Sequence, residues 1–435
     1  MKILHIISSR GWGGAENSAV YLAKKQIEKG HKAFFFIHHL NKKMIFLLGS
    51  AGVPYFSILD PERKNVFAVK KIINICKTEN IDIIHTHLGT GNYLGVLAGN
   101  FLKIPVCSTI NIFSGYPYYA MADRLLFDSL AVKDYFIKYL SGDEYKRYAP
   151  GYIERIINKI FKLKYRAADI KEIVNKMEII YERIDEAKFI DYDINHDINN
   201  INLSSCGADI KNNINTDVNS KSYNSYINNG NGIKNNINNC ENENLCKFKN
   251  FLNIGITGRV TEQKGQVYFV KAAGLLLKSG LKSLSGKPLM FHIVGNGDDE
   301  KKLKNMVNKM DIANNFKFWG YQSDVRKFVS MFDIAVSCSL NEPFGINNIE
   351  YMFMKKPCIA TNTGGIPEVY GDTNIIIPPK DAIQLKEAIE KYIKNPDIME
   401  REALRGFERA NRLFKADISV NRIMGIYEDV RAKRA

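Results

Sequence analysis

The chain has 435 residues, of which 45% are hydrophobic and 25% charged, a composition typical of a globular protein of two ordinary domains. Its formal net charge of +15 favours anionic partners such as nucleotide phosphates and anionic lipid surfaces. A basic protein without any polyanionic partner explains that charge equally well. The seven cysteines are scattered and form no CxxC pair, which favours a reducing cytoplasm and excludes a disulfide framework or a zinc site.

No apolar stretch approaches the roughly 20 residues that are needed to span a bilayer. Any membrane contact is therefore expected to be peripheral. The first residues, MKILHIISSRGWGG, carry only a short apolar run before the glycines. This pattern predicts a first β-strand and not a signal peptide.

The first half of the chain alternates short apolar runs with amphipathic stretches. Residues 2–8 form a continuous apolar run, as expected of a buried parallel strand, and a glycine loop and an amphipathic stretch at 15–30 follow. Further strands are predicted at 31–39, 81–87 and 104–112, with a helix at 92–102. This alternation predicts a doubly wound parallel sheet.

Residues 190–248 interrupt the alternation. The stretch is about one third asparagine and has no usable period, so it predicts a disordered, low-complexity insertion between two domains. It is far longer than the usual connection of about 4–6 residues. Such an insertion is tolerated because loop entropy grows slowly with length. A neutral expansion is the preferred interpretation, and a docking segment is the alternative.

The alternation restarts after the insertion. Strands are predicted within 251–260, 288–294, 314–321, 332–339, 356–362 and 374–379, and helices within 266–280, 349–356, 381–395 and 416–435. We therefore expect an α/β chain with two Rossmann-like, doubly wound domains. The expected boundaries are 1–189, the insertion at 190–248, 249–412, and a lone terminal helix at 413–435.

Two cations follow the first strand of the second half. Arg259 and Lys264 lie in GRVTEQKG, residues 258–265, between a strand and the start of a helix. Ligands bind at the carboxyl ends of strands in open α/β sheets, and a helix N-terminus with two fixed cations suits a diphosphate. A solvated loop with ordinary basic residues is the alternative.

Two glutamates lie in NEPFGINNIE, residues 341–350. Pro343 and Gly345 suit a strand-to-helix turn, after which the new helix would direct free N–H groups at a ligand. Glu342 precedes this helix and Glu350 lies about one turn into it. Carboxylates accept hydrogen bonds from paired hydroxyls, so the pattern suits a phosphorylated, polyhydroxylated ligand. For Glu342 the alternative is an acid that the helix macrodipole favours.

Two glycine loops add to this pattern. In TNTGGIPEVYGD, residues 361–372, Gly364 and Gly365 permit a close backbone approach to a ligand or merely form a turn. GWGGAENSAV, residues 11–20, opens a helix after the first strand but lacks the GxGxxG spacing. The first half also lacks a convincing acidic residue for a ribose, so a dinucleotide site is not expected.

The order of these motifs resembles the retaining glycosyltransferases of family 4, which have the two-domain GT-B fold. The features that match are the glycine loop after the first strand, GRVTEQKG, VGNG, SCSLNEPFGINNIE and TGGIPE. The match is looser over about the first 185 residues and close from about residue 250 onward. The asparagine-rich insertion has no counterpart.

The resemblance implies that the two domains face a cleft. The acceptor would bind to 1–189 and the nucleotide sugar to 249–412, and the terminal helix would cross back to the first domain. The donor-binding residues that it implies are Arg259, Lys264, Glu342, Phe344, Gly345, Ile346, Glu350, Gly14, Gly295 and Trp319.

Each of these residues has an implied role. Arg259 and Lys264 would neutralise the diphosphate, and Glu342 would contact the transferred sugar, which makes these three the expected catalytic residues. Residues 344–346 would offer backbone N–H groups, and Glu350 would hold the ribose hydroxyls. Gly14 would line the cleft from the opposite domain. The nucleobase would lie near 318–321, which includes Trp319.

No cofactor and no essential metal are expected. The chain has no D-x-D motif in a suitable context, and the two cations would stabilise the leaving diphosphate in place of a metal ion.

The acceptor side departs from the family pattern. Asn111 stands where many relatives carry a histidine that faces the acceptor, and residues 182–185 read ERID in place of N-G-[IV]-D. His87 is assigned to the acceptor side with Asn111. His85 and His87 alternate on one strand face and could bind a metal, but a cleft-lining or core role is preferred.

Residues 152–167, YIERIINKIFKLKYRA, predict a basic amphipathic helix. Five apolar residues are expected on one side of it: Ile153, Ile156, Ile157, Ile160 and Phe161. Interleaved lysines and arginines would let such a helix lie on an anionic membrane. A helix that packs its apolar stripe on the domain is the alternative.

We therefore expect an enzyme, a retaining hexosyltransferase that moves a sugar from a nucleotide-diphosphate donor, expected to be a UDP-sugar, to a glycan or lipid-linked acceptor. Its expected setting is envelope polysaccharide or glycolipid synthesis, in the cytoplasm or on the inner face of the cytoplasmic membrane. The alternatives are a sugar-nucleotide epimerase or a phosphorylase of the same fold, and a non-catalytic sugar-nucleotide or glycan-binding protein. Nucleic acid is not expected as a partner, because no recognition motif is present.

Overall fold

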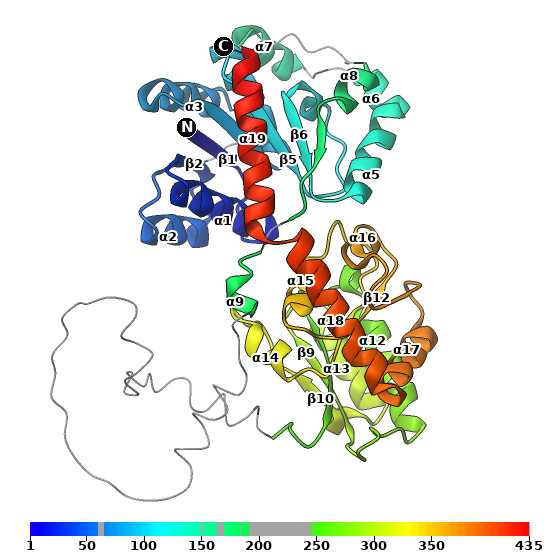
Figure 1. Ribbon diagram of the computed structural model, residues 1–435. Helices are drawn as coiled ribbons and strands as arrows, with labels where there is room; N and C mark the ends of the chain where they lie inside the picture. Colours follow the sequence, from blue (N-terminus) through cyan, green and yellow to red (C-terminus); the bar gives the residue numbers. More distant parts are fainter. Residues whose placement is uncertain are drawn as a thin grey trace, which may run out of the picture.

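The computed structural model describes residues 1–59, 65–148, 150, 152–162, 169–182, 184–190, 245 and 247–434. It confirms the predicted α/β class, with two parallel sheets that belong to two halves of the chain (Figure 1). The predicted insertion at 190–248 lies outside the described residues, except for residues 190, 245, 247 and 248.

The first sheet has seven parallel strands in the order β3-β2-β1-β4-β5-β6-β7, whose first six follow the Rossmann order. Its strands are β1 (Lys2–Ile7), β2 (Lys32–His38), β3 (Tyr55–Ile58), β4 (Ile83–His87), β5 (Val106–Ile110), β6 (Arg124–Phe127) and β7 (Met177–Ile179). The predicted strands at 2–8, 31–39, 81–87 and 104–112 correspond to β1, β2, β4 and β5.

The helices of the first half lie between these strands. They are α1 (Gly14–Glu28), α2 (Lys42–Ser50), α3 (Val66–Glu79), α4 (Gly89–Leu102), η1 (Pro117–Met121), α5 (Leu130–Ser141), α6 (Asp143–Arg147), α7 (Tyr152–Ile160), α8 (Ile170–Val174) and α9 (Ala187–Ile190). The sequence predictions omit α2, β3 and α3, and also η1, β6, α5, α6, α8, β7 and α9. The edge strand β3 has no buried residue, so it lacks the apolar run that reveals an inner strand.

The second sheet has six parallel strands in the order β10-β9-β8-β11-β12-β13, the same Rossmann order. The strands are β8 (Leu252–Thr257), β9 (Leu289–Val294), β10 (Phe316–Phe318), β11 (Ile334–Ser337), β12 (Cys358–Thr361) and β13 (Ile375–Ile377). The helices are η3 (Glu262–Lys264), α12 (Gln266–Lys278), α13 (Glu300–Lys309), η4 (Ala313–Asn315), α14 (Arg326–Met331), α15 (Ile346–Phe353), α16 (Ile366–Tyr370), α17 (Ala382–Lys394), α18 (Pro396–Leu413) and α19 (Ala416–Arg434).

Each sheet is buried on both faces, as parallel sheets require. In the first half, α3, α4 and α5 cover one face, and α1, α2 and α19 cover the other. In the second half, α12, α13 and α17 cover one face, and α14, α15, α16 and α18 cover the other. The four cysteines of the described residues, Cys76, Cys107, Cys338 and Cys358, are buried and free.

The terminal helix α19 returns from the second half and packs on the sheet of the first half (Figure 1). Its apolar residues Val420, Ile423 and Tyr427 are buried against Ile3 and Ile83 of β1 and β4. It therefore supplies part of the core of the first half.

The chain passes between the halves twice, and the two passages lie side by side. Ile184 forms a parallel bridge with Lys415, and the Ala416 backbone N–H donates to Glu186 Oε2 at 3.1 Å. Paired connections of this kind are a natural place for hinge rotation between two domains. Among the described helices, none combines the length and apolar character of a membrane span.

Candidate functional site

A lysine and a glutamate meet where β8 and β11 of the second sheet end. The Lys264 Nζ lies 2.5 Å from Glu342 Oε2, and the Ser339 hydroxyl donates to the same oxygen at 2.9 Å. The side chains of Lys264 and Glu342 are 21% and 10% exposed. The structure thus brings two of the predicted site residues together as a largely buried ion pair.

Close backbone packing creates this contact. Gly265 has a φ of +64°, and a Cβ there would lie 2.1 Å from the Cys338 carbonyl oxygen. The Leu340 N–H also donates to the Gln263 carbonyl at 2.7 Å. The two loops can approach this closely because Gly265 lacks a side chain.

The predicted turn at Pro343–Gly345 begins a helix, as expected. Gly345 precedes α15 with a φ of +102°, and Ile346 is its first residue. The first N–H groups of a helix have no acceptor within it, so this end is suited to an anion. The N–H groups of 344–346 lie next to Glu342, where the resemblance places sugar and phosphate.

Gly364 and Gly365 approach a protein loop and not an open surface. A Cβ on Gly364 would lie 1.8 Å from the Glu342 carbonyl oxygen, and one on Gly365 would lie 2.5 Å from that of Pro343. The Gly365 N–H donates to the Glu342 carbonyl at 3.0 Å. Of the two interpretations of these glycines, the structure supports a packing role that shapes the loop around Glu342.

Glu350 lies in the second turn of α15 beside a cavity of about 320 Å³ that both halves line. The pKa of Glu350 is raised to about 7, chiefly by burial and also by the Asp324 carboxylate, while Lys264 opposes the shift. A carboxyl group in such a setting is held near the midpoint of its titration at neutral pH.

The first half contributes Gly14, Ser18 and Tyr21 of α1 to this cavity. A Cβ on Gly14 would lie 3.4 Å from Ile346 Cδ1, so Gly14 faces α15 across the domain boundary as expected. On the other side, the Arg326 guanidinium binds Asp324 through two hydrogen bonds, Nε to Oδ1 at 2.8 Å and Nη2 to Oδ2 at 2.5 Å.

Three further predicted donor residues lie on the second half. Arg259 is exposed at the end of β8. Gly295, with a φ of +134°, lies against the Gly258 carbonyl and bridges to Gly320, so the VGNG turn supports the loop that carries Arg259. The Trp319 indole N–H donates to His292 Nδ1 at 3.2 Å, and its ring packs on Phe328. Trp319 is therefore engaged within the second half, and its contact with a nucleobase stays a prediction.

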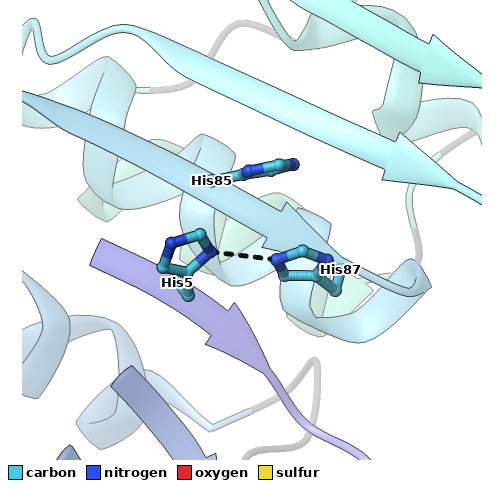
Figure 2. Close-up of side chains that lie close together, drawn as sticks. All are labelled: His5, His85 and His87. Carbon is cyan, nitrogen blue, oxygen red and sulfur yellow. Dashed lines mark hydrogen bonds between the residues drawn. The ribbon is translucent and has the colours of Figure 1, made fainter. Parts of the chain in front are cut away.

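His87 belongs to a cluster of three buried histidines, shown in Figure 2. His5 of β1 donates through Nε2 to Gln26 Oε1 at 2.8 Å, and its Nδ1 lies 3.1 Å from His87 Nε2. His85 Nε2 lies 2.7 Å from Thr109 Oγ1, and His85 Nδ1 forms a hydrogen bond with the Tyr427 hydroxyl of α19. The core role weighed for His85 and His87 fits this burial.

Among the described residues, these three histidines are close enough to be considered as metal ligands, because one ring nitrogen of each lies within 4.8 Å of the others. A metal must lie in the plane of each ring, at about 2.0–2.1 Å from the nitrogen. The rings of His85 and His87 are stacked, 4.4 Å apart and 28° between planes, so they do not point at one centre. The cluster as built does not fit a metal ion.

Asn111 follows β5 and is half-buried. Two residues on, the Phe113 ring lies 3.3 Å from a Cβ built on Gly364, so this loop reaches the second half beside Glu342. The acceptor role of Asn111 stays a prediction.

The apolar stripe of α7 packs on the domain only in part. Ile157 and Phe161 are buried in the core, but Ile156 and Ile160 are 43% and 49% exposed. The buried Asn158 explains this, because it donates to the Tyr118 hydroxyl at 2.8 Å and accepts from Tyr93 at 3.1 Å, which fixes the rotation of the helix. Residues 163–168, and the side chain of Ile153, lie outside the described residues.

Sequence reasoning missed four residues at the domain boundary: Ser129, Tyr181, Ser339 and Glu368. Ser339 and Glu368 lie inside quoted motifs, SCSL and GGIPE, so their position was a usable signal. Ser129 had the same kind of signal, because it opens SLAVKDYF, residues 129–136, which matches the family loosely. Tyr181 carries no such signal, because only the docking of the two halves gives it its partners.

Two protein-family models match the chain. The model of glycosyl transferases group 1 matches residues 240–409, and that of glycosyltransferase family 4 matches residues 12–146. Together they cover well over half of the chain, one in each half.

Among curated relatives, an alpha-D-kanosaminyltransferase of Streptomyces kanamyceticus is 24% identical over 177 residues, which is 40% of this chain and 44% of that protein. The chain spans 37–48% of the length of eight curated relatives that it matches.

Solved structures share the whole fold. A glycosyltransferase from Rickettsia africae ESF-5 has a TM-score of 0.72 at 18% identity, covering 99% of this chain and 98% of that one. Anabaena Alr3699/HepE in complex with UDP has a TM-score of 0.70 at 16% identity, covering 99% and 100%. At such identities the likeness establishes the fold.

The Lys264–Glu342 pair makes a testable prediction about stability. We expect Lys264→Met and Glu342→Gln each to lower the free energy of unfolding, because each leaves a largely buried charge without its partner. The double variant should recover part of the loss, with a coupling energy of about 0.5–3 kcal/mol in urea denaturation.

The matched control is the more exposed pair Glu300–Lys304, with side chains 24% and 51% exposed, one helical turn apart and with 2.7 Å between Nζ and Oε1. Its double-mutant cycle should give less than about 0.5 kcal/mol. A coupling energy for Lys264 and Glu342 no larger than this control would show that the pair is not an effective buried interaction.

Proposed function

The chain belongs to the glycosyl transferases of group 1 and glycosyltransferase family 4, and from this premise we propose that it transfers a sugar from a nucleotide-diphosphate donor to a glycan or lipid-linked acceptor, with retention of configuration. The observation that carries the proposal is the Lys264–Glu342 ion pair beside the start of α15, the helix whose Ile346 and Glu350 line a cavity between the two halves.

In the structure, Lys264 and Glu342 neutralise each other. An arriving diphosphate would compete for Lys264, and this would free the Glu342 carboxylate to accept hydrogen bonds from hydroxyls of the transferred sugar. The exposed Arg259 can join Lys264 on the phosphates. Donor binding would thus replace the Lys264–Glu342 ion pair with a contact between Lys264 and the diphosphate and a contact between Glu342 and the sugar.

The chemistry needs stabilisation of a leaving group. Breaking the bond between sugar and phosphate leaves a nucleoside diphosphate with added negative charge. Preorganised cations and the N-terminus of α15 would oppose that charge, and removal of one such donor typically costs about 2.7–4 kcal/mol of transition-state stabilisation. This chain's own groups would therefore serve where other enzymes use a metal, so we propose that no metal is essential.

Glu350 would hold the ribose hydroxyls from the second turn of α15. The cavity beside it supports this assignment, because it offers room for a nucleoside between the two halves. The solved complex of Anabaena Alr3699/HepE with UDP makes UDP the first nucleotide to test. Closure of the halves over the donor would exclude water and suppress hydrolysis.

Asn111 stands where a histidine is expected from the family pattern. This difference favours a second candidate function, that of a protein that binds a nucleotide sugar without transferring it. Binding would be the same in both cases, so only turnover separates them. Retention is tested by the anomeric coupling of the product in NMR.

The first prediction of this proposal concerns the donor. In a thermal-shift titration with UDP, GDP, ADP and CMP, we expect one diphosphate, UDP first, to raise the Tm by a few degrees. A ligand at 100 times its Kd stabilises by about 2.7 kcal/mol, which is enough for such a shift. The shift should be lost in Lys264→Ala and kept in Lys304→Ala, an exposed lysine of α13.

If no nucleotide shifts the wild type at millimolar concentration, the donor site does not exist. If one nucleotide binds but no nucleotide sugar is turned over in the presence of any acceptor, the binding-protein alternative replaces transfer. Turnover that persists in a metal chelator would agree with the proposed absence of an essential metal.

The second prediction concerns pH. The carboxylate of Glu350, the form that accepts hydroxyl hydrogen bonds, is present above its pKa of about 7 and is lost as the pH falls through that value. The Kd for a nucleotide sugar should therefore rise about tenfold between pH 8.5 and pH 6. UDP-glucose is the probe, since its diphosphate does not titrate in this range.

Glu350→Gln should bind more weakly at pH 8.5 and should show no comparable change with pH. A wild-type Kd that stays constant over this range, measured by calorimetry, would contradict the role of Glu350.

We also propose contact with an anionic membrane surface, with the enzyme acting in envelope polysaccharide or glycolipid synthesis on the inner face of the membrane. Support comes from α7, where the exposed Ile156 and Ile160 lie among the exposed cations Arg155, Lys159 and Lys162. Apolar side chains ringed by basic ones suit the headgroup region of an anionic bilayer.

The third prediction tests this contact. Co-sedimentation with vesicles that contain anionic lipid should be lost when Lys159, Lys162 and Lys164 become Glu, because each lysine near the surface contributes about 1 kcal/mol. A control with Lys304, Lys309 and Lys391 of the second half changed to Glu should still bind. Equal binding of both variants would remove the α7 surface from the proposal.

A further inference from the structure

The start of α5 makes hydrogen bonds both within the first half and to the second half. Ser129 is buried at its start, and its hydroxyl oxygen accepts from the Val132 N–H at 3.2 Å. The same hydroxyl donates to the Pro343 carbonyl of the second half at 2.7 Å. Pro343 stands directly after Glu342, so a residue of the first half holds the loop that carries the proposed sugar contact.

In a second contact, a side chain of the second half accepts a hydrogen bond from the backbone of the first half. Glu368 of α16 accepts a hydrogen bond through Oε2 from the Leu130 N–H at 2.7 Å. The carbonyl oxygens of Glu368 and Val369 are themselves bound by the Arg409 guanidinium at 2.8 and 2.7 Å, which fixes α16. A carboxylate at a helix N-terminus is also favoured by the macrodipole. The two halves thus exchange hydrogen bonds over two neighbouring residues, the N-cap Ser129 and the first helical residue Leu130 of α5.

The loops around these two hydrogen bonds are tightly packed against each other. A Cβ on Gly365 would lie 3.1 Å from that of Ser129, and the Gly365 N–H holds the Glu342 carbonyl. On the other side of Pro343, the Phe344 ring stacks on Tyr181 of the first half, with 5.7 Å between centroids and 13° between planes. The conformation of 342–344 therefore depends on the first half on two sides.

We propose that Ser129 and Glu368 are positioning residues, which couple the docking of α5 onto the second half to the shape of the loop that carries Glu342. This inference rests on the proposed function. Separation of the halves would break both bonds, so that the Pro343 carbonyl loses its hydroxyl donor and α5 loses an acceptor at its N-terminus. The sugar contact would then take its working shape only when the halves are docked and water is excluded.

Acidic groups gather where the halves dock. Glu368 lies near Asp134 and Asp128 of the first half, and Glu182 lies near Asp128. Burial raises the pKa of Asp128 well above its ordinary range, and Glu182 and Glu368 also raise it. Docking therefore costs either repulsion between carboxylates or the uptake of a proton, and either cost opposes the two hydrogen bonds and would help the halves to separate for product release.

The first test needs no catalysis. Hydrogen exchange of the first turn of α5, residues 128–133, reports whether Leu130 N–H is held by Glu368. We expect faster exchange in Glu368→Ala than in the wild type, and near wild-type exchange in Glu368→Gln, which keeps an oxygen acceptor. Glu408→Ala, an exposed residue of α18, is the matched control and should change nothing.

The second test measures turnover. In Ser129→Ala and Glu368→Ala we expect kcat to fall about tenfold and the ratio of donor hydrolysis to transfer to rise, while the Kd for UDP stays within about threefold. Glu368→Gln should recover most of kcat. Ser141→Ala, at the exposed end of α5, should behave as the wild type.

The two tests distinguish a failure of the proposed coupling from a failure of the proposed function. Unchanged exchange in Glu368→Ala would overturn the inference whatever the enzyme does. Changed exchange with unchanged kcat and unchanged hydrolysis in folded variants would overturn the coupling and leave only a structural contact. A wild type that neither binds nor turns over any nucleotide sugar would remove the proposed function, and the coupling with it, whatever the exchange shows.

Discussion

The polarity of parallel strands is the constraint on which the rest of this structure depends. Every strand of a parallel sheet ends at the same edge, so the loops that follow the strands gather there. Here two such sheets face each other, and the loops after β8, β11 and β12 meet those after β1, β5 and β6. The ion pair, the cavity and the contacts between the halves all lie at this meeting of edges.

Within that arrangement, Lys264 and Glu342 neutralise each other. A buried lysine and a buried carboxylate are each costly alone, and under the proposed function they would stay paired until the donor diphosphate binds. The same pair explains why the loop with Glu342 must be so well defined. Its carbonyl oxygens are held by Gly365 and Ser129, because a carboxylate that must change partners needs a fixed backbone behind it.

The sequence predicts the elements whose signals are local. Buried strands such as β1 and β4 show continuous apolar runs, and the turn at Pro343–Gly345 shows its residue types directly. The edge strand β3 has no such run. The rotation of α7 depends on Asn158 finding two tyrosines far along the chain, which periodicity does not reveal. Likewise the partners of Ser129 and Glu368 arise only from docking two sheets that are predicted separately.

The return of α19 to the first sheet bears on how the chain is made. Tyr427 forms a hydrogen bond with His85, and its neighbours in α19 cover β1 and β4. The core of the first half, which is synthesised first, is therefore completed by a helix that is synthesised after the second half. Domains usually fold in order as a ribosome extends the chain at about 5–20 residues per second. The first half is an exception to that order, since the apolar face around Ile3 and Ile83 stays uncovered until the second half has been synthesised. During that interval, nascent chains would depend on chaperones to keep this face from aggregating.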